Sequence, residues 1–429
     1  MQFYIALLLL ISAGAASAQL QKLDRRQAVR YALQNSPSFN SARNEREVAD
    51  LTVKSSFWAL FPSLDFTASY GLQDDDPSTY ETPYTSQLAL SLTETLYDNG
   101  VLLTQNKIAN LARRRAELIF RKEKNRLVRE VLEAYMKFSL QSRNLEVKEI
   151  QLDLIRRQYN LVSSAYKQGL KTRKDFLRFK TQLNRTQLDM VNARNSVEKT
   201  RLDLLKAIGV QPPQYTAFSF ITEPVPTTIA VPTAPLNWKN NYIYQATELQ
   251  SGINRLQADI TARKYFPEIY LTAGATYGSS NYWNTSEHFE DNDRLDAVAL
   301  LTVKYNLWDW GIRRRDRRAA VLNRQTQENT LDIERRTLAG DLDKLMLDLR
   351  QLQQNFDLSR ELLSLEENNY KALERDYREG RAQYLDLITS LTDLSDSRIR
   401  YYSSAIDLQL SVYEYRYYEG TLYDEFEKN

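Results

Sequence analysis

The sequence predicts a mixed fold in which strands of a membrane β-barrel lead into long coiled-coil helices. Between its widely spaced glycines lie long segments that contain almost no Gly or Pro, and four shorter stretches alternate between apolar and mostly polar residues. This order of segments occurs twice. An internal repeat of this size indicates two copies of one structural unit. Glycines mark the repeat, and each recurs 211 residues later: Gly100 and Gly311, Gly169 and Gly380, Gly209 and Gly420.

The segments between these glycines are predicted to be helices. Residues 101–168 and 170–208 contain no Gly or Pro, and their counterparts 312–379 and 381–419 contain only Gly340. At 1.5 Å per residue, helices of ~68 and ~39 residues would be roughly 100 Å and 60 Å long. A left-handed glycine ends a helix, so each pair is expected to form an antiparallel hairpin with a tight tip at Gly169 or Gly380.

Apolar residues recur at every seventh position along these segments. A strict seven-residue period forces helices to supercoil against neighbours, so the sequence predicts coiled-coil packing. The positions in the first copy are Val131, Phe138, Leu145, Leu152, Tyr159, Tyr166, Phe176, Leu183, Met190, Val197 and Leu204. Those in the second are Leu342, Leu349, Phe356, Leu363, Tyr370, Tyr377, Leu387, Leu394, Tyr401, Leu408 and Tyr415.

A period of two replaces the helical period ahead of each hairpin. The alternation predicts strands over 63–72 and 87–93, and again over 269–277 and 295–307. We expect the even positions of 64–72 and the odd positions of 297–307 to face lipid. Loops are predicted at 73–86 and around 281–294, and a helix broken at Ser36–Pro37 is predicted over 23–61.

The predicted organisation has five parts. Residues 1–18 form a signal peptide, because an apolar core at 4–11 precedes the small-residue motif Ala16-Ser17-Ala18. The first repeat (helix, two strands, long hairpin) covers 19–209. A proline-rich linker, 210–235, joins it to the second repeat, 236–420, and 421–429 form a C-terminal tail.

The composition argues against catalysis. There is no cysteine, and the single histidine, His288, lies in a predicted acidic loop, so neither a metal site nor a catalytic base is expected. No phosphate-binding glycine loop or cofactor motif is present. A net charge of +2 argues for no nucleic-acid partner. We therefore expect no enzyme activity, cofactor or metal.

Four half-apolar strands cannot close a membrane barrel, since the smallest barrels have about eight strands and an open edge is not tolerated in lipid. The chain is therefore expected to oligomerise around an axis, and three copies would give twelve strands in one barrel. The alternative is an extracytoplasmic coiled-coil scaffold, or a periplasmic adaptor, without a membrane barrel. Apolar bands on the strands favour the barrel.

The chain resembles the TolC-like outer-membrane efflux proteins over nearly all of its predicted mature length. The turn Tyr-x-x-Gly-(x5)-Asp-apolar-apolar occurs twice, from Tyr166 and from Tyr377, and the segments 96–100 and 307–311 open the long helices. The opening from Leu23 to Pro37 adds to the likeness. The resemblance implies a homotrimer in the outer membrane with its helices in the periplasm. It also implies a periplasmic adaptor and an inner-membrane transporter, in a tripartite efflux or type I secretion system.

The resemblance also implies a periplasmic gate near the second tip. Asp386 matches a lumen-facing acidic position of the family, whereas the next such position is Thr389 here, which leaves Asp393 as a substitute. Tyr377 matches an aromatic residue that latches the closed mouth, and Arg381 is a further gate candidate. The ordinary alternatives are a helix-capping role for Asp386, a coiled-coil core position for Tyr377, and solvent exposure for the charges.

Two further groups of candidates complete the predicted sites. The tips are expected to contact the adaptor through Tyr166, Gly169, Asp175 and Gly380, beside the basic run 171–174. At the strand ends, an interfacial aromatic girdle is predicted, made by Tyr97, Trp308 and Trp310. The arginine triplets 113–115 and 313–315 could contact lipid headgroups or form the wet face of a helix.

Overall fold

The computed structural model describes residues 21–72, 83–282 and 294–428. The predicted signal peptide, most of the two predicted strand-connecting loops and His288 lie outside these residues. The chain divides into two compact units, each built from both halves of the sequence. We call residues 42–120 and 243–336 the strand unit. The hairpin unit comprises the described residues of 1–41, 121–242 and 337–429.

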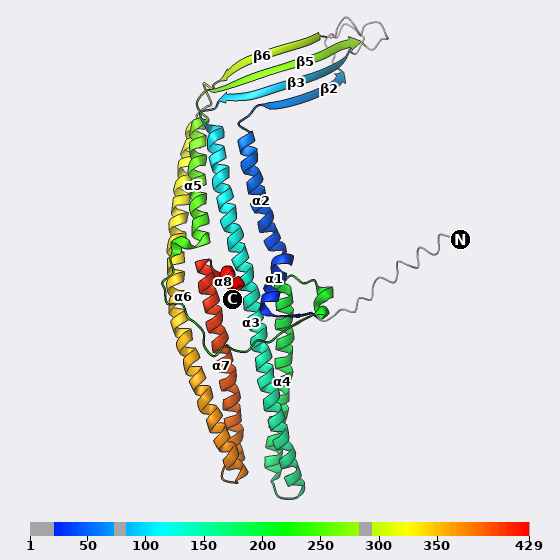
Figure 1. Ribbon diagram of the computed structural model, residues 1–429, viewed down its shortest axis with the longest axis vertical. Coiled ribbons are helices and arrows are strands. Elements are labelled where there is room, and N and C mark those ends of the chain that lie inside the picture. Colours follow the sequence, from blue (N-terminus) through cyan, green and yellow to red (C-terminus); the bar gives the residue numbers. More distant parts are fainter. Residues whose placement is uncertain (1–20, 73–82, 283–293, 429) are drawn as a thin grey trace, which may run out of the picture. The chain divides into compact units, whose positions relative to one another are not determined.

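The strand unit contains one four-stranded antiparallel sheet (Figure 1). Its strands lie in the order β2-β3-β5-β6, so β2 and β6 are the two edges. The bounds are β2 (Ser63–Leu72), β3 (Pro83–Tyr97), β5 (Glu268–Tyr282) and β6 (Arg294–Lys304). All four predicted strands are present, and β3 and β5 are longer than predicted.

The predicted extension of the last strand to Leu307 is wrong, because β6 ends at Lys304. The physical reason is the length of its neighbour. Lys304 pairs with Glu268, which is the first residue of β5, so residues 305–307 have no strand beside them in the chain.

Strand register identifies equivalent residues of the two repeats. Leu64 lies opposite Leu92 in the β2–β3 pair, and Ile269 lies opposite Val303 in the β5–β6 pair. The second pair follows from the first if β2 is shifted by 205 residues and β3 by 211. The helices ahead of the strands obey the smaller shift, since α2 (Pro37–Trp58) and α5 (Tyr242–Arg263) each have 22 residues.

Polar contacts join α2 and α5 to the N-terminal parts of the long helices α3 (Val101–Lys167) and α6 (Ile312–Arg378). Asn106 of α3 donates a hydrogen bond to the Ser56 hydroxyl over 3.0 Å. On the other helix pair, Arg255 lies 3.3 Å from Glu328. Within residues 21–72, 83–282 and 294–428, no helix is both long enough and apolar enough to cross a membrane.

The hairpin unit contains the remainder of α3 and α6 and their return helices α4 (Arg173–Ala207) and α7 (Tyr384–Glu419). Every predicted seventh-position residue of α7 is buried, from Leu387 to Tyr415. Those of α4 are half-buried until Leu204, which is fully buried. The predicted tail forms a short helix, α8 (Leu422–Lys428), whose first residue is buried.

Side chains of the long helices bind the backbone of the predicted linker. The Tyr135 hydroxyl of α3 donates to the carbonyl of Ile221, and the Tyr415 hydroxyl of α7 donates to that of Ala234 over 3.0 Å. Within this stretch lie a 3-10 helix (Pro212–Ala217) and β4 (Phe218–Phe220), which pairs in parallel with β1 (Gln21–Leu23). A second 3-10 helix, Trp238–Asn240, follows, and α1 (Arg25–Asn35) precedes α2.

We predict that Tyr135→Phe lowers the free energy of unfolding of the hairpin unit by about 1–1.5 kcal/mol, because the hydrogen bond from this buried side chain to the carbonyl of Ile221 is lost. Burial also raises the pKa of Tyr135, so its contribution is present below pH ~10 and lost above it. The control is Tyr159→Phe, which keeps the ring contact with Phe176. Equal denaturation midpoints for the two variants would contradict the prediction.

Candidate functional site

The first hairpin tip is built by one glycine and one threonine. Gly169 has a left-handed backbone with φ +76°, and the next amide, of Leu170, donates to the carbonyl of Ala165. This bond closes α3 in the manner of a Schellman motif. Thr172 then caps α4: its hydroxyl accepts from the amide of Asp175 and donates to the Asp175 carboxylate over 2.8 Å. Asp175 therefore belongs to the capping pair.

Aromatic rings join the two helices of this tip. Tyr166 stacks on Phe176 with 5.1 Å between ring centroids and 15° between ring planes. Tyr159, one seven-residue repeat before Tyr166, contacts the same ring. The structure thus places Tyr166 at the end of the helix–helix contact, with part of its surface exposed.

The second tip repeats the backbone path with different side chains. Gly380 has φ +75°, and the amide of Arg381 donates to the carbonyl of Asp376. The Arg381 guanidinium pairs with the carboxylates of Asp376, at 2.9 Å, and Glu379. The Asp386 carboxylate accepts from the amide of Gln383 over 3.3 Å, which is a helix-capping contact. Half-buried Tyr377 has a pKa raised by burial.

An exposed polar stripe runs along α7 from this tip. Asp386 and Asp393 are both exposed, while the residues directly after them, Leu387 and Leu394, are buried. Thr389 lies on the same exposed stripe and donates its hydroxyl to the carbonyl of Leu385. The stripe continues through three charges that the sequence analysis did not single out, although they keep the same spacing: Asp396, Arg400 and Asp407.

The two tips differ in charge at equivalent positions. The first tip, residues 164–181, has six cationic side chains and one carboxylate, whereas residues 375–392 have three of each. The six cations of the first tip are all exposed: Lys167, Lys171, Arg173, Lys174, Arg178 and Lys180. The basic run that the sequence singled out is thus part of a larger basic tip.

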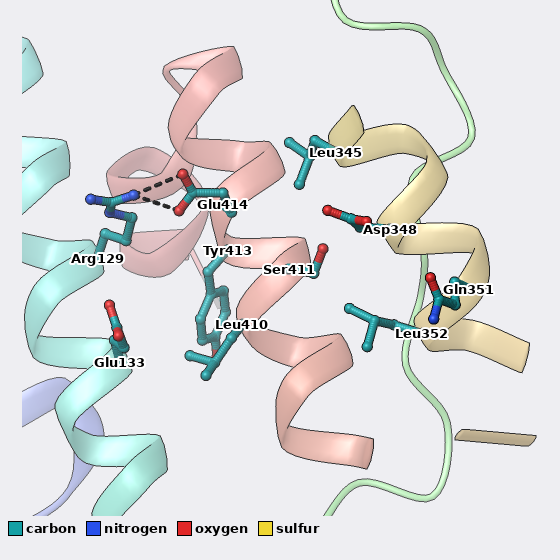
Figure 2. Close-up of a pocket in the computed structure, with 10 residues that line it drawn as sticks. All are labelled: Arg129, Glu133, Leu345, Asp348, Gln351, Leu352, Leu410, Ser411, Tyr413 and Glu414. Atoms are coloured by element: carbon teal, nitrogen blue, oxygen red, sulfur yellow. Dashed lines mark hydrogen bonds and ion pairs between the residues drawn. The ribbon is translucent and has the colours of Figure 1, made fainter. Parts of the chain in front are cut away.

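A cleft of about 530 Å³ lies within the hairpin unit between α3, α6 and α7 (Figure 2). Arg129 crosses toward α7 and forms a two-pronged ion pair with Glu414, at 2.6 and 2.8 Å. Carboxylates of Glu133 and Asp348 also line the cleft. In the described part of the chain, no three metal-ligating side chains gather in one place. The lining joins helices through charge and contains no paired nucleophile and base.

Each long helix of the strand unit begins with the same capped turn. Asp98 accepts from the amides of Gly100 and Leu102, and Asp309 accepts from those of Gly311 and Arg313. The residue directly before the glycine of this turn has a left-handed backbone in both copies, with φ +59° at Asn99 and +54° at Trp310. Asparagine tolerates this conformation, whereas a bulky tryptophan there is strained.

The predicted girdle residues lie at these turns. Tyr97 is the last residue of β3, and Trp308 and Trp310 form an edge-to-face pair with 5.8 Å between centroids. All three are exposed, and Trp310 is 80% exposed. The sequence prediction of an interfacial role for them stays a prediction.

Two strands followed by a long helical hairpin occur twice along the chain, giving one four-stranded sheet and two hairpins, which is the architecture of an outer-membrane channel subunit. The profile of the family described as outer membrane efflux protein matches residues 28–210 and 240–410. The chain belongs to this family, whose members are transport proteins of the outer membrane rather than enzymes.

Relatives with solved structures share the fold. The chain is 17% identical to a membrane protein from Pseudomonas aeruginosa, with a TM-score of 0.76 and 93% of each chain covered. It is 12% identical to the Campylobacter jejuni CmeC outer membrane channel, with a TM-score of 0.77, covering 93% of this chain and 86% of that one. The outer membrane protein VceC from Vibrio cholerae gives 16% identity, a TM-score of 0.75, and coverage of 90% and 94%.

One relative is matched in sequence over a shorter stretch. The alkaline protease secretion protein AprF of Pseudomonas aeruginosa is 24% identical over 278 residues, which is 62% of this chain. The match spans 57% of the length of that relative.

We predict that Arg129→Gln lowers the free energy of unfolding by about 1.5–3 kcal/mol, because Glu414 loses a charged hydrogen-bond partner in a partly enclosed cleft. Both side chains of the pair are less than one third exposed. The matched control is Arg157→Gln, whose ion pair with Asp153 is exposed, with an expected loss of about 0.5 kcal/mol or less. Losses of the same size at both sites would show that the Arg129 pair contributes no more than a surface pair.

Proposed function

We propose that the protein is a passive export channel in which three copies close one twelve-stranded barrel in the outer membrane. The observation that carries the proposal is the open sheet, whose edges β2 and β6 have no neighbouring strand in the described chain. Unpaired backbone groups cost several kcal/mol each in lipid, so a spanning sheet must close on itself. Four strands are too few to do so, whereas three copies supply twelve.

Exposed leucines on the helices support the same assembly. On α4, Leu188 and Val191 project from the hairpin unit, and on α6, Leu347, Leu358 and Leu365 do so. Apolar side chains at helical spacing call for a partner surface, and neighbouring copies of the chain would provide one. The helices of three copies would then form a tube in the periplasm below the barrel.

The cargo proposed is a solute or protein delivered by an inner-membrane transporter through a periplasmic adaptor. Similarity to an alkaline protease secretion protein supports protein export, and membership of the outer membrane efflux protein family supports solute export. The hairpin tips around Gly169 and Gly380 are the proposed contact with the adaptor. The exposed cations of the first tip would meet acidic groups there.

A scaffold or adaptor without a membrane barrel is the alternative function. The strands disfavour it, because apolar side chains stand exposed on the sheet, with Phe66 68% and Leu301 66% exposed. Lipid is the environment that makes such a surface stable.

The experiment that tests the proposal is a mass measurement of the detergent-extracted complex, followed by reconstitution in planar bilayers. We expect three copies of the chain and discrete ion conductance. A monodisperse monomer that needs no detergent would overturn it.

We predict that Leu301→Arg impairs assembly and costs roughly 2–4 kcal/mol if the residue lies near the bilayer midplane. Thr302→Arg should be tolerated, because adjacent residues of a strand face opposite sides of the sheet. Trimer yield from membranes measures both variants. Equal loss of trimer in both variants would show that the lipid-facing side of the strand has been assigned wrongly.

We predict that Asp386→Asn weakens the block of single-channel current by divalent and trivalent cations, since a ring of three carboxylates at a constriction attracts cations. The amide oxygen can still accept from Gln383, so the helix cap is kept. Asp393→Asn should act in the same direction. Asp357→Asn, on α6 and paired with Arg360, is the control. Unchanged block in the first two variants, at normal trimer yield, would remove these residues from the gate.

A further inference from the structure

The internal repeat predicts which residues of β6 and β2 would pair between two copies of the chain. Within one chain, β3 of the first repeat already pairs with β5 of the second, and Leu92 lies opposite Ala273. In a closed ring the next junction joins β6 of one copy to β2 of its neighbour. Since β6 is equivalent to β3 and β2 to β5, this second junction repeats the first with both partners exchanged.

The equivalence is supported by backbone geometry as well as by sequence. The repeat glycines agree in φ within 2°, at +77° and +79°, +76° and +75°, and +81° and +82°. Among the residues that the structure describes, two non-glycine residues have left-handed backbones, Asn99 and Trp310, and they are 211 residues apart. Helices α2 and α5 begin and end at residues 205 apart.

We propose that β6 pairs antiparallel with β2 of a second copy in one fixed register, and that an aromatic contact between Trp310 and Trp58 of the two copies closes the junction. The register places Val303 opposite Ala68 and Leu301 opposite Tyr70. It follows from adding 211 to the β3 residue and subtracting 205 from the β5 residue of each observed pair. The inference rests on the proposed ring of copies and adds its register and contact residues.

The internal junction shows what happens at the strand ends. Asn99 donates from its side chain to the carbonyl of Pro267 over 2.9 Å, and Arg263, the last residue of α5, donates to the carbonyl of Asn99 over 3.0 Å. Residue 263 thus touches the left-handed residue. Its equivalent on α2 is Trp58, and the equivalent of Asn99 is Trp310, so the same geometry brings two tryptophans together.

At the internal junction the carbonyl of Asn99 accepts from an arginine on the β5 side, Arg263. At the proposed junction the guanidinium comes from the β6 side instead. The Trp310 carbonyl accepts from Arg315 of its own helix α6 over 3.2 Å, so this carbonyl does not need an arginine at position 58. Trp58, whose ring contacts that of Phe61 in its own copy, supplies an apolar face instead. Both side chains are largely exposed in a single copy, Trp58 to 66% and Trp310 to 80%.

Burial shows the same difference between a filled and an unfilled junction. Val101, at the start of α3 beside the internal junction, is buried, whereas its equivalent Ile312 is 51% exposed. Thr104 is buried, and its equivalent Arg315 is exposed. A neighbouring copy placed by the repeat would cover this surface and would also relieve the cost of exposing the strained Trp310.

Disulfide trapping tests the register directly, because the chain has no cysteine of its own. We expect the pair Val303→Cys and Ala68→Cys to form chain-to-chain disulfides under mild oxidation in membranes, giving covalent dimers and trimers on a denaturing gel. Directly opposed residues bring their Cβ atoms within disulfide reach, whereas diagonal neighbours are about 7–8 Å apart. Pairing Val303→Cys with Tyr70→Cys, or Thr302→Cys with Ala68→Cys, should therefore give none.

The matched positive control is Leu92→Cys with Ala273→Cys, the equivalent pair inside one chain, which should close without any ladder. A ladder from the shifted pairs and not from 303 with 68, in a complex of three copies, would overturn the register and leave the channel function intact. Absence of any complex of copies would overturn both.

A double-mutant cycle tests the aromatic contact. Trp58→Ala and Trp310→Ala should each lower the temperature at which the detergent-resistant complex dissociates, and the double variant should fall no further than the more affected single variant. Residues in contact lose their shared interaction once. Additive losses would mean that the two tryptophans meet lipid separately, and would overturn the contact.

Discussion

A membrane strand must have a hydrogen-bonding neighbour on each side, and the rest of the structure depends on this constraint. The described sheet satisfies it for β3 and β5 and leaves it open for β2 and β6. Unpaired amides and carbonyls are costly in lipid, so in the proposed channel the missing neighbours come from other chains. The proposed oligomer is in this sense part of the fold of each copy.

Duplication gives the chain a ready geometry for that oligomer. One junction between strands of the two repeats is formed inside the chain, where β3 pairs with β5. In the proposed ring its counterpart is formed by the two free edges, β6 and β2. The side chains at the two junctions differ, with polar Asn99 and Arg263 at the internal one and Trp310 and Trp58 at the free edges. An aromatic contact suits a junction that forms between separate molecules, because it contributes burial without a buried unpaired charge.

Much of the fold could be predicted from the sequence because long helices and alternating strands leave strong local patterns. Gly169 and Gly380 mark the tips, since only a left-handed residue ends α3 and α6 there. Tertiary contacts decided what was missed. Residues 305–307 are not part of a strand, because no strand of the same chain lies beside them. The Tyr135 hydroxyl donates to a linker carbonyl that is distant in sequence, which no local pattern indicates.

The candidate site was predicted less fully than the fold. Sequence spacing placed Asp386 and Asp393 on one face of a helix, and both are exposed on α7. A helix-capping role for Asp386 was the ordinary alternative offered by the sequence, and its carboxylate does accept from the amide of Gln383. The sequence could not reveal that Thr172 caps α4 by accepting from the amide of Asp175, because capping depends on the backbone path of the tip. The strain at Trp310 was likewise invisible, since backbone angles are not encoded by a single residue type.

Amide hydrogen exchange of the sheet in the detergent-extracted or membrane-embedded protein tests the central claim most directly. Protection of a backbone amide reports whether it has a hydrogen-bond partner. We expect the outer-edge amides of β2 and β6 to be protected as strongly as those of the central strands β3 and β5. Rapid exchange along β2 and β6, beside slow exchange in β3 and β5, would show that the edges remain open and would contradict it.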